Sequence, residues 1–307
     1  MNSCVELGES MSNSNDTKTV VITGASSGIG RTTVLHLAEK GYTIAFCARR
    51  EASLIDLNAQ LQSLGVQSFY RAFDVTDEEA MHQFANYVVA RFGRIDVWIN
   101  NASVYILGRF ADIPSDAFRR TMDVNYLGYL YGIQAVYPHL VRQGGGIIIN
   151  VDSMDGKVGV PLASPYVASK FAVRGLTESL RAELADENIE ICAVLPAVMD
   201  TPLFDHAANY FGKKMVAMPP ISSPDVVAEA ILDLIENPKK EVTVGTGSTL
   251  MEATHAIAPD KMTKSMVGMV EKAHFADREV PFTEGNLYEP MPMAGEATGG
   301  WKDGREE

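Results

Sequence analysis

Short apolar runs recur along the chain between residues 18 and 244, and each is followed by a longer segment in which apolar residues return with helical spacing. Nearly continuous apolar strands that alternate with helices are typical of a parallel sheet covered by helices on both faces. The pattern therefore predicts an α/β fold, a doubly wound parallel sheet of about seven strands with right-handed crossovers. The predicted strands are Thr19–Ile22, Thr43–Cys47, Gln67–Ala72, Val97–Ile99, Gly146–Val151, Glu190–Leu195 and Glu241–Val244. The predicted helices are Ile29–Lys40, Ala52–Leu64, Asp77–Phe92, Pro114–Arg142, Pro165–Glu187 and Ser223–Glu236.

The same alternation of predicted strands and helices predicts how the chain is divided into segments. Residues 1–17 are polar and are expected to form a disordered lead-in, residues 18–245 form the α/β domain, and residues 201–222 interrupt it as an insert. The βα alternation stops in the tail, residues 246–307, where Met262, Met266, Met269 and Val270 have helical spacing. Residues 280–301 contain aromatic side chains, which disordered tails normally lack. We therefore expect an ordered helical and extended tail that packs on the body of its own or a neighbouring subunit.

Composition and charge narrow the class of protein. The chain has 307 residues, of which 46% are hydrophobic and 21% charged, as in ordinary globular proteins. Its formal net charge of −13 argues against nucleic-acid binding, which depends on basic contacts to phosphate. No apolar run is long enough for a transmembrane helix, and we expect no membrane partner. The three cysteines and six histidines show no metal-ligand spacing, so no metal site is expected. The absence of an apolar signal core favours a cytoplasmic protein.

The segment between the first predicted strand and helix carries a glycine-rich loop, Thr23-Gly24-Ala25-Ser26-Ser27-Gly28-Ile29-Gly30. Glycines at such a turn allow close approach of a ligand to the backbone. The start of the following helix offers free N–H groups and a positive dipole end to a pyrophosphate. The loop, including Ser26, Ser27 and Ile29, is therefore a candidate dinucleotide site.

Five ordered motifs carry a specific resemblance. The glycine loop is similar to the TGxxxGxG fingerprint of the short-chain dehydrogenase/reductase family. Further matches are Asn100-Asn101-Ala102-Ser103 for NNAG, Asn125 for the helix-borne asparagine, Ser153 with the YxxxK motif Tyr166–Lys170, and Pro196-Ala197-Val198-Met199-Asp200-Thr201 for PGxVxT. The resemblance spans residues 18–244 and implies a Rossmann fold. The sequence departs from the family at Ser103, Ala197, Asp152 and Asp155. The two acids put an apolar substrate pocket in doubt.

The resemblance implies a catalytic set of Asn125, Ser153, Tyr166 and Lys170. Tyr166 and Lys170 stand at i and i+4 of a predicted helix and share a face. A nearby lysine cation is expected to lower the pKa of a tyrosine from near 10 toward a useful range, so that Tyr166 can act as acid and base. The Ser153 hydroxyl would hydrogen-bond the substrate oxygen. By resemblance, Lys170 also binds the nicotinamide ribose and Asn125 supports a proton relay through water.

The end of the second predicted strand bears on the choice of cofactor. NAD-binding chains carry an acid there for the adenosine ribose, whereas this chain has Ala48-Arg49-Arg50. Arginines pair well with a 2′-phosphate, so we expect NADP, with NAD as second choice. By resemblance, the remaining cofactor contacts are Asp74 and Val75 at the adenine, Thr201 at the nicotinamide carboxamide, and Asn101, Ala102, Pro196 and Val198.

The sequence thus predicts an NADP-dependent oxidoreductase acting on a small carbonyl or alcohol substrate. One alternative is a catalytically idle NAD(P)-binding sensor or scaffold of the same fold. A sugar-nucleotide epimerase or dehydratase would need a larger C-terminal domain. In the family, the region of insert 201–222 covers the substrate, and its apolar side chains favour a partly apolar ligand. The two long predicted helices, 114–142 and 165–187, pair across a two-fold axis in the family, so we expect a homodimer or homotetramer.

Overall fold

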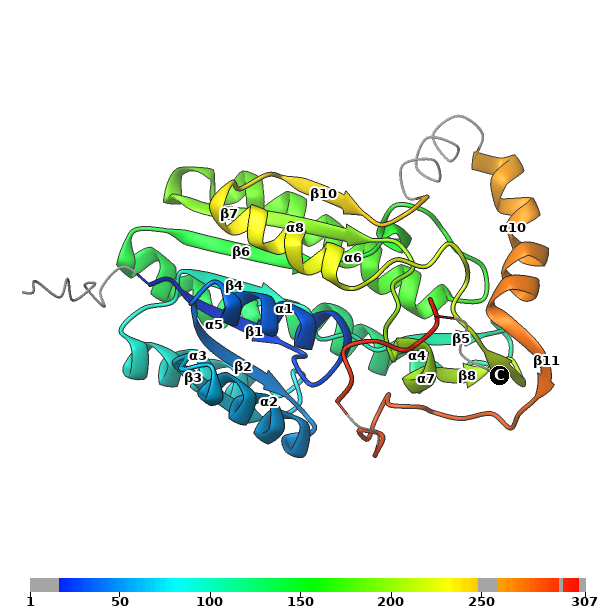
Figure 1. The fold of residues 1–307 in the computed structure, drawn as a ribbon. Helices are drawn as coiled ribbons and strands as arrows, with labels where there is room; N and C mark the ends of the chain where they lie inside the picture. The colour runs from blue at the N-terminus through cyan, green and yellow to red at the C-terminus, as the bar shows by residue number, and fades with distance from the viewer. Residues whose placement is uncertain (1–16, 248–258, 293–294, 304–307) are drawn as a thin grey trace, which may run out of the picture.

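The computed structural model describes residues 17–247, 259–292 and 295–303. Its centre is a parallel sheet of seven strands in the order β10-β7-β6-β4-β1-β2-β3, which confirms the predicted fold class (Figure 1). The order reverses between β1 and β4, and such a switch point is where open α/β sheets bind ligands. The strands are β1 Thr19–Thr23, β2 Thr43–Ala48, β3 Ser68–Ala72, β4 Val97–Asn100, β6 Gly146–Val151, β7 Ile189–Pro196 and β10 Glu241–Val244.

Helices cover both faces of the sheet (Figure 1). One layer contains α1 Gly28–Glu39, α2 Glu51–Ser63 and α8 Asp225–Glu236, and the other contains α3 Glu78–Phe92, α5 Gly128–Gln143 and α6 Ser164–Glu183. Successive side chains of β1 point to opposite faces of the sheet and so contact both helix layers. Val20 and Ile22 pack with α1 and α2, while Val21 packs with α3 and α5. A strand buried on both faces must be apolar throughout, which explains the unbroken runs in the sequence.

The helix predicted over Pro114–Arg142 is interrupted in the structure. It consists of α4 Ser115–Met122, a π-helical segment Asp123–Leu127 and α5. The π-helical turn contains Asn125, and such turns are frequent at functional sites. The helix predicted to end at Glu187 is α6 followed by a short 3₁₀ turn, Ala185–Glu187.

Four short strands outside the main sheet were not predicted. In the insert, β8 Ala208–Tyr210 pairs with β5 Ile106–Gly108, and β9 Lys213–Met215 pairs with β11 Phe275–Glu279 of the tail. The insert also holds α7 Leu203–His206. The second pairing ties the insert to the tail over about 60 residues of sequence.

The tail helix is α10 Pro259–His274. Met266 and Val270 pack on Val158 and Val160 of the body, whereas Met269 of the predicted stripe is 58% exposed. Residues 1–16 of the predicted lead-in and residues 248–258 of the predicted tail lie outside the described residues, as does the side chain of Met262 from the predicted stripe. Among the helices that are described, none has the length and apolar character to cross a bilayer. The described side chains also include no group of three that could hold a metal ion.

Candidate active site

A cleft with a cavity volume of about 180 Å³ opens at the carboxyl ends of the central strands, beside the switch point. It brings together most of the residues singled out in the sequence, although these come from widely separated segments. Asn125, Ser153, Pro196 and Val198 are described but are not among the lining residues. The predicted residues that line the cleft are Gly24, Ser26, Ser27, Gly28, Ile29, Gly30, Arg49, Arg50, Asp74, Val75, Asn101, Ala102, Tyr166, Lys170 and Thr201.

The glycine loop forms one wall of the cleft, and its glycines are required by packing. Gly24 has φ +72°, and a Cβ there would lie 2.6 Å from the Cα of Ala102. A Cβ on Gly30 would lie 2.3 Å from the carbonyl oxygen of Gly24. The side chain of Asn101 donates to the Thr23 carbonyl at 2.9 Å and the Gly24 carbonyl at 3.2 Å, and so fixes the loop to the end of β4. The tight loop at the start of α1 fits the phosphates of a dinucleotide.

Tyr166 and Lys170 lie one turn apart on α6, on the floor of the cleft. The Tyr166 ring is 7% exposed and meets the ring of Tyr105 edge-on, with 4.7 Å between centroids. Lys170 Nζ donates to the Val151 carbonyl at 2.9 Å and lies 5.7 Å from the Tyr166 ring centroid. The lysine is therefore adjacent to the tyrosine ring, as the i, i+4 spacing predicts.

The expected lowering of the tyrosine pKa is not what the structure gives. Burial raises the pKa of Tyr166 above its ordinary value, and the charges of Asp155 and Asp152 raise it further. The hydrogen bond with Ser153 lowers this pKa but does not offset the other effects. Burial of the hydroxyl is the main physical reason that the simple tyrosine–lysine argument is incomplete, and the charges of the two acids act in the same direction.

Burial also shifts the pKa values of the charged neighbours. It lowers the pKa of Lys170 to about 8, against the opposing effect of Asp152 and Asp155. It raises the pKa of Asp152 to about 7 and that of Asp155 to about 7. Neither carboxyl oxygen of Asp152 has a hydrogen-bond partner in the part of the chain that is described. Burial thus disfavours the cation of Lys170 and the anions of both acids.

Asn125 lies behind the cleft and is fully buried. Its Nδ2 donates to the Val104 carbonyl and to Ser169 Oγ, both at 3.0 Å. Its Oδ1 accepts from the Val104 N–H at 2.8 Å and from Ser103 Oγ at 3.1 Å. The amide thus joins the loop after β4 to α6, and its part in a water relay stays a prediction.

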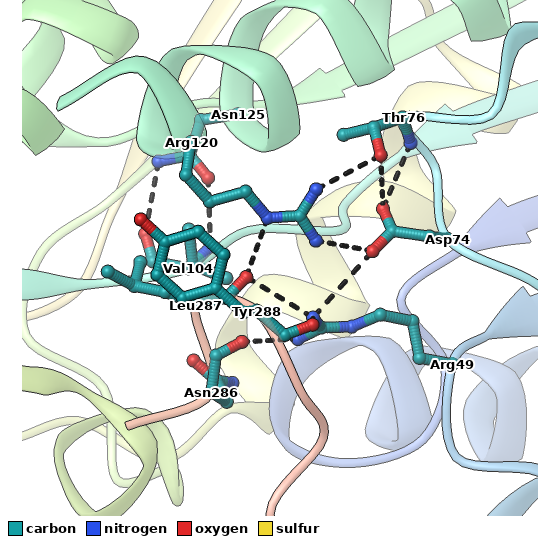
Figure 2. A network of polar contacts seen from close by, with 9 residues as sticks. All are labelled: Arg49, Asp74, Thr76, Val104, Arg120, Asn125, Asn286, Leu287 and Tyr288. Carbon is teal, nitrogen blue, oxygen red and sulfur yellow. Dashed lines mark hydrogen bonds and ion pairs between the residues drawn. The ribbon is translucent and has the colours of Figure 1, made fainter. Parts of the chain in front are cut away.

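A charged network marks the predicted adenosine end of the cleft (Figure 2). Asp74 accepts from the N–H of Thr76 at 3.0 Å and from the Nη2 of Arg120. Burial alone would raise the pKa of Asp74, but these partners hold it below its ordinary value. Arg49 Nη1 lies 3.7 Å from Asp74, and burial lowers the pKa of Arg49. An anionic carboxylate thus sits between two cations.

Sequence reasoning missed three residues of this site. Arg120 comes from α4 and completes the network around Asp74. His206 and Asn286 line the cleft from the insert and the tail, and each has a buried polar atom with no hydrogen-bond partner among the described residues, His206 Nε2 and Asn286 Oδ1. Burial lowers the pKa of His206 to about 4, so its ring is neutral at pH 7. No local motif surrounds these residues, and only tertiary structure brings them to the cleft.

Comparison with known proteins agrees with this geometry. The family model described as short chain dehydrogenase matches residues 18–209. The uncharacterized oxidoreductase YxnA of Bacillus subtilis is 35% identical over 275 residues, which cover 88% of this chain and 77% of that protein. An alcohol dehydrogenase from the archaeon Thermococcus sibiricus, solved with 5-hydroxy-NADP, superposes with a TM-score of 0.66 at 30% identity, covering 75% of this chain and 96% of that one.

A variant of actinorhodin polyketide ketoreductase, solved with NADPH, superposes with a TM-score of 0.68 at 27% identity, covering 76% of this chain and 97% of the other. The family model covers more than half of the chain, and the glycine loop, Tyr166 and Lys170 meet in one cleft. The chain belongs to the short-chain dehydrogenase/reductase family and is an oxidoreductase of Rossmann fold.

Proposed function

We propose that the protein is an NADP-dependent reductase or dehydrogenase that interconverts a carbonyl and an alcohol, with Tyr166 as the acid and base. One observation carries this proposal. The Tyr166–Lys170 face of α6 and the glycine loop at the start of α1 line the same cleft, although they are separated by more than 130 residues. This arrangement allows one bound dinucleotide to meet both the phosphate-binding loop and the proton donor.

The residues of the cleft suit a nicotinamide dinucleotide. The glycine loop would hold its phosphates, Lys170 the nicotinamide ribose and Thr201 the carboxamide. When bound, the cofactor supplies or accepts the hydride. The chain moves the proton: the Tyr166 hydroxyl gives it to the substrate oxygen as negative charge develops there, and the Ser153 hydroxyl donates a hydrogen bond to the same oxygen. The cation of Lys170 would stabilise the phenolate that remains on Tyr166 after the proton has left.

The preference for NADP rests on Arg49 and Arg50 and on the two structural neighbours solved with NADP-type ligands. Arg50 Nη2 lies 3.3 Å from Ser26 Oγ, so its guanidinium is already close to the glycine loop. Guanidinium groups suit a phosphate on the adenosine ribose, because they can bind two of its oxygens at once.

Aromatic side chains next to Tyr166 favour a partly apolar substrate. The ring of Phe204 contacts Tyr105, Trp301 and His274, with centroid distances of 5.6, 6.2 and 5.6 Å. Phe204 belongs to α7 of the insert, where a substrate-covering role was expected from the sequence. Asp152 adds an ionisable group to the lining of the cleft, and a substrate with a hydrogen-bond donor would satisfy its carboxyl oxygens.

Substitution of Tyr166 tests the proposal. Tyr166→Phe keeps the ring but removes the hydroxyl, so kcat for reduction of a carbonyl panel should fall by roughly 100-fold or more, while NADPH binding measured by titration stays within about twofold. The half-buried Tyr137, which pairs with Glu187 on the far end of α5, provides the control variant Tyr137→Phe.

Three results would count against parts of the proposal. Retention of more than about a tenth of kcat in Tyr166→Phe would refute the tyrosine as the acid. Tighter binding of NADH than of NADPH by wild-type protein would refute the cofactor preference. Dinucleotide binding without turnover on any carbonyl or alcohol would favour the idle sensor.

A further inference from the structure

The end of the chain returns to the cofactor cleft. After β11 the chain runs back past α7, and the red segment in Figure 1 crosses toward the start of α1. We call the two described parts of this segment, 286–292 and 295–301, the C-terminal strap. Asn286, Pro290 and Met291 line the cleft, and Leu287 is fully buried. The strap is therefore part of the site and not a surface appendage.

The first contact of the strap is with the two arginines at the predicted adenosine end (Figure 2). Arg49 Nη1 donates to the carbonyls of Leu287 at 3.3 Å and Tyr288 at 2.9 Å, and its Nη2 donates to the carbonyl of Asn286. Arg120 Nε donates to the Leu287 carbonyl at 2.7 Å. The guanidinium assigned to the 2′-phosphate is thus turned toward backbone oxygens of the strap.

The second contact is with the glycine loop. The N–H of Gly28, at the first position of α1, donates to the carbonyl oxygen of Glu296 at 2.9 Å. Gly295 packs so closely that a Cβ there would lie 2.6 Å from the carbonyl oxygen of Ser26 and 2.9 Å from the side chain of Ser53. A backbone oxygen of the strap therefore occupies a donor at the place where a pyrophosphate is expected.

The third contact anchors the far end of the strap. The N–H groups of Trp301 and Gly299 donate to Asp200 Oδ1 at 2.8 and 3.1 Å. Trp301 Nε1 donates to the Thr201 carbonyl at 3.1 Å. These contacts hold the strap beside Thr201, the residue assigned to the carboxamide.

The strap also leaves little space in the cleft. With the strap in place the cavity measures about 180 Å³, less than the roughly 300–1,000 Å³ typical of ligand pockets.

We propose that the C-terminal strap is an intramolecular competitor of the dinucleotide, which must displace Gly295 and Glu296 from the glycine loop and take Arg49 from the carbonyls of residues 286–288. The inference rests on the proposed function, because it assigns the glycine loop and Arg49 to the cofactor. The strap and the dinucleotide would compete for two groups of the protein. The Gly28 N–H has a single proton to donate, so it can serve only one of them. Arg49 would bind an anionic phosphate more strongly than the neutral carbonyls of the strap. Apparent cofactor affinity is then reduced by the fraction of molecules in which the strap is closed.

The experiment measures binding of NADP⁺ to the full-length protein and to two opened variants. Ending the chain after Glu289 removes the contact with the glycine loop but keeps Leu287 in place. Gly295→Val leaves the chain intact and places side-chain atoms against Ser26 and Ser53. Gly268→Val is the matched control, because Gly268 is exposed on α10 and a Cβ there meets nothing within 4 Å. Calorimetric titration gives Kd for each, and circular dichroism checks the fold.

We expect Kd for NADP⁺ to fall at least about fivefold in both opened variants, the lower end of ordinary coupling between sites, and to stay unchanged in Gly268→Val. Addition of NADP⁺ to wild-type protein should speed amide hydrogen exchange in residues 295–303. An unchanged or raised Kd in folded opened variants would overturn the competitor role, as would slower exchange on adding NADP⁺, which marks a clamp. If neither the wild-type protein nor a folded opened variant binds NADP⁺ or NAD⁺, the proposed function fails instead.

Discussion

At the residue scale, the acids at 152 and 155 distinguish this site from the family pattern. They replace small residues next to Tyr166 and Lys170, and burial places the pKa values of both acids near 7. An acid whose pKa is higher in the folded than in the unfolded protein binds its proton more tightly when folded. Such a group makes the protein less stable as the pH rises from the unfolded pKa, about 4, through the folded pKa.

This sign predicts a pH-dependent gain from removing one acid. Asp155→Asn should raise Tm at pH 8 by about 2–4 °C or more, the shift that ~1 kcal/mol produces in a domain of this size. The gain should be much smaller at pH 4, because Asp155 is then protonated in the folded state and about half protonated in the unfolded state. Thermal unfolding at a series of pH values measures it, with the exposed Asp112→Asn as control. A Tm loss at pH 8, or the same change at both pH values, would contradict the assignment.

At the scale of elements, the packing of α5 on β4 depends on one glycine. A Cβ on Gly132 would lie 2.3 Å from Asn100 Oδ1 and 2.7 Å from Trp98 Nε1. These two atoms are hydrogen-bonded to each other at 2.8 Å, and Asn100 continues to Asn150 on β6 at 2.9 Å. The chain of side-chain bonds joins the centre of the sheet to the helix layer, and α5 must approach closely to cover it.

Gly132→Ala should therefore lower the free energy of unfolding by roughly 1–3 kcal/mol, the usual cost of overpacking a core. Gly268→Ala is the matched control, since Gly268 lies on the exposed side of α10 with nothing within 4 Å of its Cβ position. There, alanine should stabilise the helix by about 0.5–1 kcal/mol. Urea unfolding of both variants gives the two values, and effects of the same sign would refute this view of the α5 packing.

Some helices and strands could be predicted from the sequence, and others could not. The strands of the main sheet were predictable because burial on both faces requires unbroken apolar runs, and α1 was marked by its glycine loop. The strands β5, β8 and β9 have only three residues each, which is too short for a recognisable alternation of apolar and polar residues in the sequence. Arg120 and Asn286 reach the site through tertiary contacts alone. The strap contacts Arg49, Arg120 and Gly28 through backbone carbonyls. Every residue has such a carbonyl, so these contacts could not be predicted from the types of residue in the sequence.

At the scale of the whole molecule, the outer helices leave apolar surface uncovered. Phe171 on α6 is 45% exposed, and Val141 on α5 is 45% exposed. A symmetric pairing of these helices between two copies of the chain would bury both. The predicted homodimer or homotetramer would therefore use the layer of α5 and α6, leaving the layer of α1, α2 and α8 in solvent.

We expect light scattering at micromolar concentration to give at least a dimer for the wild-type protein. Phe171→Glu places a charge in the proposed interface and should shift the mass toward the monomer. Leu64→Glu, at the end of α2 on the opposite layer, should leave the mass unchanged although Leu64 is 61% exposed. A wild-type monomer would refute the prediction, and equal effects of the two variants would place the interface elsewhere.

The carbonyl contacts of Arg49 and Arg120 have a consequence for sequence changes in the strap. Every amino acid carries a backbone carbonyl, so exchange of Asn286 or Tyr288 for another residue preserves the oxygens that the arginines bind. One residue inserted or deleted between β11 and Asn286 would instead move those oxygens by up to about 3.3–3.6 Å along the chain, enough to break each bond. The contacts of residues 286–288 with the two arginines should therefore tolerate most substitutions of Asn286 and Tyr288 but not a change in the length of the segment that leads to them.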